Sequence, residues 1–497
     1  MQEFNEKSET DKLVVDDLII QRKQKIDKLR QKGIEVYPNK YDTTCSIAGV
    51  IKDEQALTDK ELKVCGRIMS MRIMGKASFA HIKDMSGKIQ IYIKKDDIGE
   101  DNYSVFRLMD IGDFVGIAGK LFHTKTGELT IHTAALTLLS KSLRPLPEKW
   151  HGLKDIETRY RQRYVDLIVN ENVRNVFMNR SRIIQLIRKY FDDRGFIEVE
   201  TPMMQPIAGG ATAKPFITHH EVLDMDMYLR IAPELYLKRL VVGGFEKVYE
   251  INRNFRNEGI STKHNPEFTM LEVYNANTDY ISMMELCEAL FNSIAEKILN
   301  KTEVNSREKI INLKTPWPRL SFYEILKEKT GRDFSTVNSR EEMAKIADEL
   351  GVKYSGTNGE HKILDHIFDS FIQPELINPA FIVDYPAKYS PLAKSKKDNP
   401  EIAERFELFI NGQELANAYS ELNDPVRQRE KMEEQVKDRE LVAEGGCVDE
   451  DYLRALEYGM PPCSGLGIGI DRLVMLFTDA PSIRDVILFP QMKKEAE

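Results

Sequence analysis

The 497-residue chain lacks several features that assign a protein to a common class. No apolar run is long enough to cross a bilayer, and the acidic, polar start is unlike a signal peptide, so no membrane role is expected. The five cysteines form no CxxC pair, which argues against a zinc site and favours reduced thiols in a cytoplasmic protein. The net charge of −8 argues against a general nucleic-acid binder, so any RNA contact must use local basic patches.

Common catalytic signatures are missing as well. No GxxxxGKS or GxxxxGKT sequence occurs, which excludes a P-loop ATPase. The glycine-rich stretch at residues 465–469 departs from the GxGxxG spacing at Ile470, so it is not a dinucleotide fingerprint. No HExxH motif is present, and the pair at residues 219–220 is best explained as a polar turn.

Residues 246–275 are the stretch on which the functional assignment depends. Polar and apolar residues alternate with period two on both sides of the polar loop 257–266, which predicts two strands joined by a turn. One face carries amides, carboxylates and Arg256 beside aromatic rings. That mixture suits a ligand, with a planar cation for phosphate, a ring for a base and acids for an amine. An ordinary hairpin with one solvated face is the alternative.

Residues 404–424 predict a second hairpin, because the Asn-Gly pair at 411–412 is a strong turn signal. With that turn, Glu407 faces Ala416 and lies diagonally from Glu414. Two converging carboxylates repel each other unless a cation joins them. A divalent metal site is therefore one interpretation, and a solvated strand edge is the other.

Glycine occupies every second position at residues 465–469, which leaves one face of a predicted strand bare. A flat group can lie against such a face. Asp471 is expected to cap the helix that follows, with Arg472 in its first turn.

The N-terminal part divides into a helix and a region of short strands. Residues 11–32 have a helical apolar stripe that ends at Gly33, and the basic second half is either a solvated face or a phosphate-contacting arm. Residues 62–140 alternate with period two between regular turns, which predicts an all-β barrel of the OB-fold type. On such a barrel an exposed ring such as Phe79 can stack a base, and an amide such as Gln90 can read its edge.

Three stretches together resemble class II aminoacyl-tRNA synthetases. Arg256 stands in Phe-Arg-Asn-Glu and Phe268 follows His-Asn-Pro-Glu, which resembles the second signature motif of that class. The helix, strand and proline of residues 180–202 resemble the first motif, and residues 463–477 resemble the third. The closer resemblance is to the bacterial type of class II lysyl-tRNA synthetase, and it extends over nearly the whole chain.

This resemblance implies an α+β fold, in which a catalytic domain built on an antiparallel sheet with helices follows an N-terminal β-barrel. Residues 1–145 would be the N-terminal helix and the anticodon-binding OB-fold, and residues 146–160 a linker. Residues 161–497 would form the catalytic domain, with a helical insertion around 280–400. The first motif implies a homodimer.

The implied activity is the joining of lysine to tRNA(Lys) with ATP and Mg²⁺. The resemblance implies two catalytic residues, which are Arg256 and Arg472. It implies that ATP contacts Arg256, Glu258, His264, Phe268 and Arg472. Lysine would contact Gly210, Glu234, Glu272, Tyr274, Asn417 and Glu421. Glu407 and Glu414 would hold the metal, and the anticodon would meet Arg72, Phe79, Gln90 and Glu128.

This site requires a break in the second hairpin. A strict pleat puts Asn417 and Glu421 on the opposite face from Glu414, yet the implied site needs all of them close together. A β-bulge near residues 416–418 is therefore expected.

Two other classes of function compete with this one. A non-catalytic RNA-binding protein could keep the barrel beside a degenerate synthetase body, but Arg256, Arg472, Glu407 and Glu414 are all intact. An enzyme that lysylates a protein would resemble the catalytic domain alone, so the predicted barrel at 62–140 favours tRNA.

Overall fold

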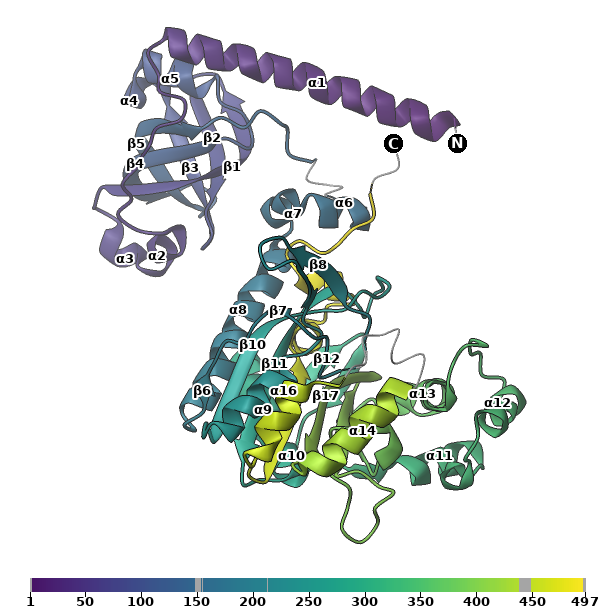
Figure 1. The fold of residues 1–497 in the computed structure, drawn as a ribbon. Helices are drawn as coiled ribbons and strands as arrows, with labels where there is room; N and C mark the ends of the chain where they lie inside the picture. The colour runs from purple at the N-terminus through teal and green to yellow at the C-terminus, as the bar shows by residue number, and fades with distance from the viewer. Residues whose placement is uncertain (1, 148–152, 154, 212, 438–447, 495–497) are drawn as a thin grey trace. The chain divides into compact units, whose positions relative to one another are not determined.

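The computed structural model describes residues 2–147, 153, 155–211, 213–437 and 448–494. The chain divides into two compact units, residues 1–154 and 155–497 (Figure 1). The division falls in the stretch expected to be a linker, of which residues 148–152 and 154 lie outside the described residues. Four cysteines are described as free thiols, and Cys447 lies outside the described residues.

The first unit is a barrel with an N-terminal helix. Its elements are α1 (Gln2–Gln31), α2 (Ile47–Lys52), α3 (Glu54–Leu57), β1 (Leu62–Met74), β2 (Ala77–Lys83), β3 (Lys88–Lys94), α4 (Lys95–Ile98), α5 (Glu100–Phe106), β4 (Phe114–His123) and β5 (Leu129–Ser140). The strands close in the order β1-β2-β3-β5-β4, with β3 and β5 parallel, so the predicted barrel is confirmed. The interior is filled by every second residue, for example Ile89, Ile91 and Ile93 of β3. The span is not all-β, because α4 and α5 separate β3 from β4.

Helix α1 confirms the predicted N-terminal helix and ends where Gly33 takes a φ of 74°, a conformation that glycine adopts without strain. Leu29 is fully buried in the barrel core. Arg22 is also buried, and it donates hydrogen bonds to the carbonyls of Ser142 at 2.8 Å and Arg144 at 3.2 Å. This part of the basic half therefore anchors the helix to its own unit.

The second unit is built on one large sheet. Its helices are α6 (Ile156–Arg161), α7 (Arg163–Val169), α8 (Glu171–Asp192), α9 (Glu234–Val242), α10 (Tyr280–Leu299), α11 (Phe322–Thr330), η1 (Phe334–Thr336), α12 (Arg340–Glu349), α13 (Glu360–Phe371), η2 (Gln373–Glu375), η3 (Ala387–Tyr389), α14 (Pro425–Lys437), α16 (Glu450–Glu457), α17 (Ile470–Thr478) and α18 (Ile483–Val486). Its strands are β6 (Ile197–Glu198), β7 (Met204–Gln205), β8 (Phe216–His220), β9 (Met225–Leu229), β10 (Lys247–Phe255), β11 (Glu267–Ala276), β12 (Glu303–Ser306), β13 (Lys309–Asn312), β14 (Arg319–Ser321), β15 (Ala380–Val383), β16 (Arg405–Ile410), β17 (Gln413–Ser420) and β18 (Cys463–Gly469).

The eight-stranded sheet has the order β14-β15-β16-β17-β18-β11-β10-β6, and most of its neighbouring strands are antiparallel. Both predicted hairpins are present, as the pairs β10–β11 and β16–β17. Asn411 and Gly412 turn the second hairpin with φ values of 51° and 65°, as an Asn-Gly turn requires. The late strand β18 lies between the two hairpins and joins them into one sheet.

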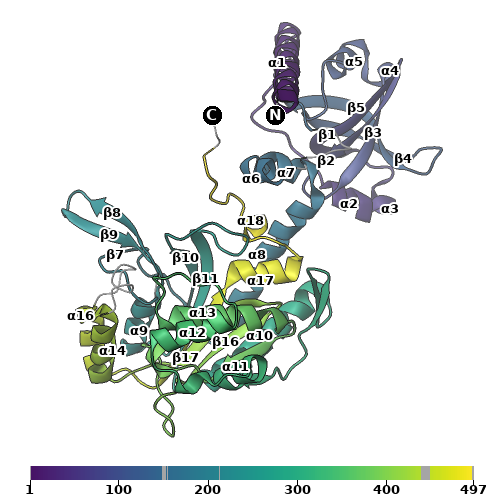
Figure 2. The same cartoon turned by 90° about the vertical axis from the view of Figure 1, so that its right-hand side faces the viewer.

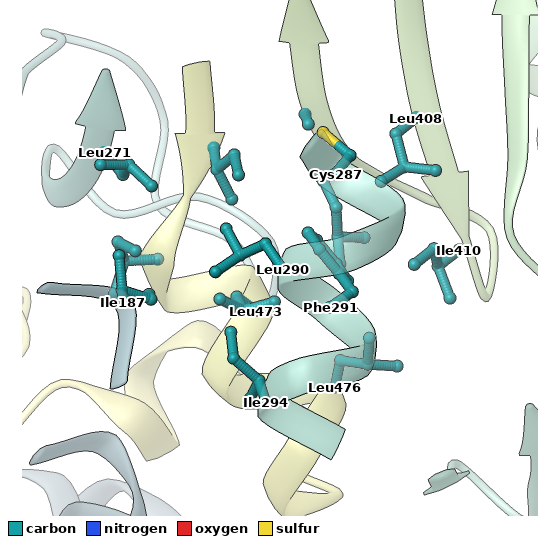
Figure 3. Close-up of a cluster of buried hydrophobic side chains, with 14 of the residues drawn as sticks. Ile187, Leu271, Cys287, Leu290, Phe291, Ile294, Leu408, Ile410, Leu473 and Leu476 are labelled. Atoms are coloured by element: carbon teal, nitrogen blue, oxygen red, sulfur yellow. The ribbon is translucent and has the colours of Figure 1, made fainter. Parts of the chain in front are cut away.

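One face of this sheet carries the main hydrophobic core (Figure 3). Helices α10 and α17 cover that face, and Leu290 and Phe291 of α10 pack near Leu473 and Leu476 of α17. Side chains alternate along each strand, so Leu271 enters the core while its neighbour Glu272 turns to the other face. Packing on one face thereby orients the residues of the opposite face.

The span 280–400 is less helical and less separate than expected. Helix α10 belongs to the main core, and β14 and β15 extend the large sheet. Helices α11, α12 and α13 form a second core beside β15 and β16 (Figure 2). Among the described residues, no helix is long and apolar enough to span a membrane.

Candidate active site

A cavity of about 500 Å³ opens on the face of the large sheet opposite the main core. It gathers residues from both hairpins, from β18 and from the start of α9. The residues from the sequence analysis that line it are Gly210, Glu234, Arg256, Glu258, His264, Phe268, Glu272, Tyr274, Glu414, Asn417, Glu421 and Arg472. Glu407 lines an adjoining cavity, and Glu414 lines both.

The floor of the cavity is the glycine stripe of β18. Gly465 pairs with Tyr274 on β11 and with Tyr419 on β17. A Cβ atom on Gly465 would lie 2.1 Å from the Oε1 atom of Glu421 and 2.7 Å from the Tyr274 ring. Glycine is required here because the neighbouring strands fill the space above the floor with their own side chains.

Arg256 provides the positive end of the cavity. Its guanidinium lies 5.2 Å from the centre of the Phe268 ring, where cation–π attraction holds it. The Nε atom is buried without a hydrogen-bond partner, which leaves a donor for a ligand. Burial lowers the pKa of Arg256, although neighbouring carboxylates, Glu258 first, oppose this effect.

Arg472 lies near Glu414 and His264. Its guanidinium donates to the Glu414 carbonyl at 2.6 Å and lies 3.5 Å from the Nε2 atom of His264. Burial, followed by the charge of Arg472, lowers the pKa of His264 and so favours the neutral imidazole. The expectation for Asp471 is wrong, because no side chain caps α17. Asp471 is buried and accepts the Thr269 backbone N–H at 2.7 Å instead.

The expected bulge in the second hairpin is present, but it is displaced towards the turn. The register shifts opposite Leu408, so the extra residue is Leu415 rather than one of 416–418. Glu407 therefore pairs with Asn417 and not with Ala416, which corrects the predicted register. This extra residue brings Asn417 and Glu421 to the same cavity as Glu414, as the predicted site requires.

Glu407, one of the two acids expected to hold the metal, is partly buried and hydrogen-bonded to neighbouring side chains. Glu407 accepts hydrogen bonds from Arg405 at 2.5 Å and from the Tyr385 hydroxyl at 2.9 Å. Burial raises the pKa of Glu407 to about 7 despite the opposing effect of Arg405, and the charge of Glu414 adds to the rise. Asn417 accepts from the Nε atom of Arg405 at 3.2 Å.

The opposite end of the cavity is acidic and buried. Glu421 is 1% exposed, and its Oε2 atom forms an ion pair with Lys238. Lys238 also donates to the Oε1 atom of Glu234 at 2.6 Å, and that oxygen accepts the Tyr419 hydroxyl at 2.5 Å. The hydroxyl of Tyr274 donates to Glu272 at 3.3 Å.

These acids are short of positive charge. Burial, followed by the charge of Glu234, raises the pKa of Glu272 to about 8. Burial also raises the pKa of Glu421 well above its usual range, although Lys238 opposes the rise. A ligand that carries positive charge would relieve both effects.

The barrel holds a second cluster of polar and aromatic side chains. Gln90 donates to Glu128 at 2.7 Å, and the other carboxylate oxygen of Glu128 lies 2.8 Å from the ring of His81. Phe79 is half-buried against Tyr92, with ring centres 4.9 Å apart. Arg72 is exposed and is the cross-strand partner of Phe79 on β1.

Sequence reasoning missed several members of both clusters. Lys238 carried a signal, because it stands four residues after Glu234 on one helix and so faces the same side. Arg405 and Tyr419 belonged to the second hairpin, but their position depends on the bulge at Leu415. In the barrel the missed residues are His81, Tyr92 and His132.

Each of the two units matches a known protein family. Residues 155–493 match the family of class II tRNA synthetases (D, K and N). Residues 62–139 match the OB-fold nucleic acid binding domain. The chain therefore belongs to the class II tRNA synthetases of the D, K and N group.

Within that class, several similar curated proteins are lysine–tRNA ligases. The lysine–tRNA ligase of Carboxydothermus hydrogenoformans is 56% identical over 480 residues, which cover 96% of this chain and 98% of the relative. That of Pelotomaculum thermopropionicum is 54% identical over 96% of this chain and 95% of the relative. That of Syntrophomonas wolfei is 53% identical over 95% of this chain and 96% of the relative.

Proposed function

We propose that the protein is a lysine–tRNA ligase, which activates lysine with ATP to lysyl-adenylate and transfers it to the 3′ end of tRNA(Lys). One observation carries this proposal. A single cavity has Arg256 at one end and the buried Glu421 at the other, so it can hold a molecule that is anionic at one end and cationic at the other. The names of the similar proteins agree with it.

The first step needs alignment rather than a general base. A carboxylate oxygen of lysine, already ionised, attacks the α-phosphorus of ATP, and the bond from that phosphorus to the pyrophosphate oxygen breaks. Arg256 can contact the α-phosphate and the lysine carboxylate together, since a guanidinium presents several donors in a fixed fork. Its unpartnered Nε atom supports this role. Holding both reactants in line accounts for most of the acceleration expected at such a site.

The adenine would lie on Phe268 with Arg472 beside it. Both residues line the cavity next to the glycine floor, and stacking with cation–π attraction suits a flat base. His264 lies 3.5 Å from Arg472, and Glu258 lines the same part of the wall. We assign these two residues to holding the nucleotide.

Glu407 and Glu414 suit a magnesium ion shared with the nucleotide phosphates. Mg²⁺ is commonly held by one or two carboxylates together with substrate phosphates. The acids offer oxygen donors, and burial raises the pKa of Glu407 to about 7 although Arg405 opposes the rise, so a cation bound there would favour the ionised carboxylate. When bound, the ion would neutralise charge on the phosphates. An unchanged magnesium titration in the double variant Glu407→Gln, Glu414→Gln would contradict this assignment.

Lysine would be bound through both of its ammonium groups. Glu421 and Tyr274 would meet the ε-ammonium, because Glu421 is the deepest acid in the cavity. Glu234 and the Gly210 carbonyl would meet the α-ammonium. Asn417 is assigned to the carboxylate of lysine. Glu272 lines the same wall and is assigned to balancing the positive charge of the ammonium groups.

The barrel is assigned to the anticodon of tRNA(Lys). Phe79 offers a ring for stacking, and Arg72 lies across the strand pair from it. Gln90 and Glu128 hold each other at 2.7 Å, which fixes the edge they present to a base. We further infer a cytoplasmic homodimer that pairs through residues 180–202. In support, Ile197 is half-exposed on β6, the terminal strand of the large sheet.

The decisive experiment is ATP–pyrophosphate exchange with each of the twenty amino acids, followed by charging of tRNA. Lysine should support exchange far better than the other nineteen, and tRNA(Lys) should accept it. Exchange with no amino acid would favour a non-catalytic RNA-binding protein. Normal exchange without any tRNA charging would favour lysylation of a protein.

A further inference from the structure

Lys238 is a buried cation behind the wall of the proposed lysine site. It lies on the second turn of α9, is fully buried, and is not among the residues that line the cavity. Its ammonium contacts Glu234 at 2.6 Å and forms an ion pair with Glu421. Burial lowers the pKa of Lys238, but the two carboxylates outweigh burial and raise it well above its usual value, so the charge persists.

This cation joins the two ends of the proposed lysine site. Glu234 is assigned to the α-ammonium and Glu421 to the ε-ammonium, and they come from separate parts of the chain. Glu234 begins α9, whereas Glu421 follows β17 and is fixed by its backbone N–H to the Cys463 carbonyl at 2.8 Å. Within the described part of this wall, Lys238 is the residue that contacts both carboxylates.

The charges of the buried acids also indicate that Lys238 is matched to this site. Glu234, Glu272 and Glu421 are all less than 9% exposed, and Lys238 is the cation paired with members of this set. The neighbouring Arg230 is paired with Glu250 at 2.7 Å. With every acid ionised, these four described residues carry an excess of two negative charges, which equals the charge of two substrate ammonium groups.

We propose that Lys238 is a positioning residue that sets the distance between Glu234 and Glu421, and thereby selects lysine over its homologue one methylene shorter, ornithine. This inference rests on the proposed function. With Lys238 in place, one ammonium holds both carboxylates, so a shorter diamino acid reaches only one of them. Without it, the two acids repel each other, take up protons and are free to follow a shorter substrate.

The test is pyrophosphate exchange by Lys238→Met, with lysine and ornithine measured separately. Methionine keeps the length of the chain and removes the charge. Because a hydrophobic pocket discriminates one methylene by only about 10–200-fold, we expect the kcat/KM ratio of lysine to ornithine to fall by about 10-fold or more. The KM for lysine should rise, while the KM for ATP stays within about two-fold, since Arg256 and Phe268 are untouched.

Two further variants separate positioning from stability. Lys141 is a matched control, since it is equally buried and is paired with Asp110 and Asp113 in the barrel. Lys141→Met should leave the lysine-to-ornithine ratio at its wild-type value. Lys238→Arg keeps the charge and should retain more of the ratio than Lys238→Met.

The ratio does not depend on how much of a sample is folded, so partial unfolding does not mask the result. An unchanged ratio in Lys238→Met would overturn the inference, and so would equal losses for lysine and ornithine. Failure of the wild-type protein to exchange with lysine would instead overturn the proposed function. The two failures are therefore distinguishable.

Discussion

Gly465→Ala is the substitution for which the structure gives the sharpest expectation. The new methyl group would lie 2.1 Å from the Oε1 atom of Glu421, where an ordinary contact is about 3.4–4 Å. Glu421 cannot turn away freely, because Lys238 holds its other oxygen and the Tyr274 ring lies 2.7 Å from the same methyl position. The carboxylate must therefore move by about 1 Å, a displacement that commonly costs about 100-fold in rate.

The assay is pyrophosphate exchange with lysine and ATP varied in turn. We expect kcat/KM for lysine to fall by about 100-fold, equivalent to about 2.7 kcal/mol, with little change in the KM for ATP. Gly356→Ala is the matched control, because a Cβ there meets nothing within 4 Å and the residue lies outside both sites. A folded Gly465→Ala enzyme with kcat/KM within about three-fold of wild type would refute the argument from the cavity floor.

Three further outcomes can be checked. Arg256→Ala should lower exchange by about 10²–10³-fold, as loss of a preorganised charge donor does, and a folded variant with near-normal exchange would refute the role. Phe79→Ala should weaken tRNA charging by about 1–3 kcal/mol and leave lysine-dependent exchange intact, whereas a joint loss would contradict the separate roles of the two units. In the absence of lysine, the stability that protonated Glu272 contributes should be fully present below the unfolded pKa of its carboxyl group and should be lost as the pH rises through about 8. The free energy of unfolding in urea should therefore depend less on pH in Glu272→Gln than in the wild-type protein. The same pH dependence in both proteins would contradict the raised pKa.

Local patterns predicted the elements that carry the site. The period-two alternation around Arg256 predicted β10 and β11, and the Asn-Gly pair predicted the turn between β16 and β17. Both are short-range signals, so the sequence contains them directly. The barrel was predicted in the same way from alternating isoleucines such as Ile91.

The predictions that were wrong concern features that depend on contacts between segments far apart in the sequence. The position of the bulge at Leu415 is set by packing on β18, since Ala416 pairs with Ile468 there. Asp471 was expected at a cap but meets Thr269 across the sheet, about two hundred residues away in sequence. The ion pair of Lys238 with Glu421 likewise needs the whole sheet to form.

The place of β18 in the sheet has a consequence for synthesis. A chain that leaves the ribosome from its N-terminus makes both hairpins before it makes residues 463–469. Until then β11 and β17 each have an unpaired edge, which is a template for pairing with other chains. The strands of the barrel all precede residue 141, so the barrel can fold before β18 has been synthesised and the larger sheet can be completed. Chaperone binding during translation should therefore be greatest in the interval between the emergence of β17 and that of β18.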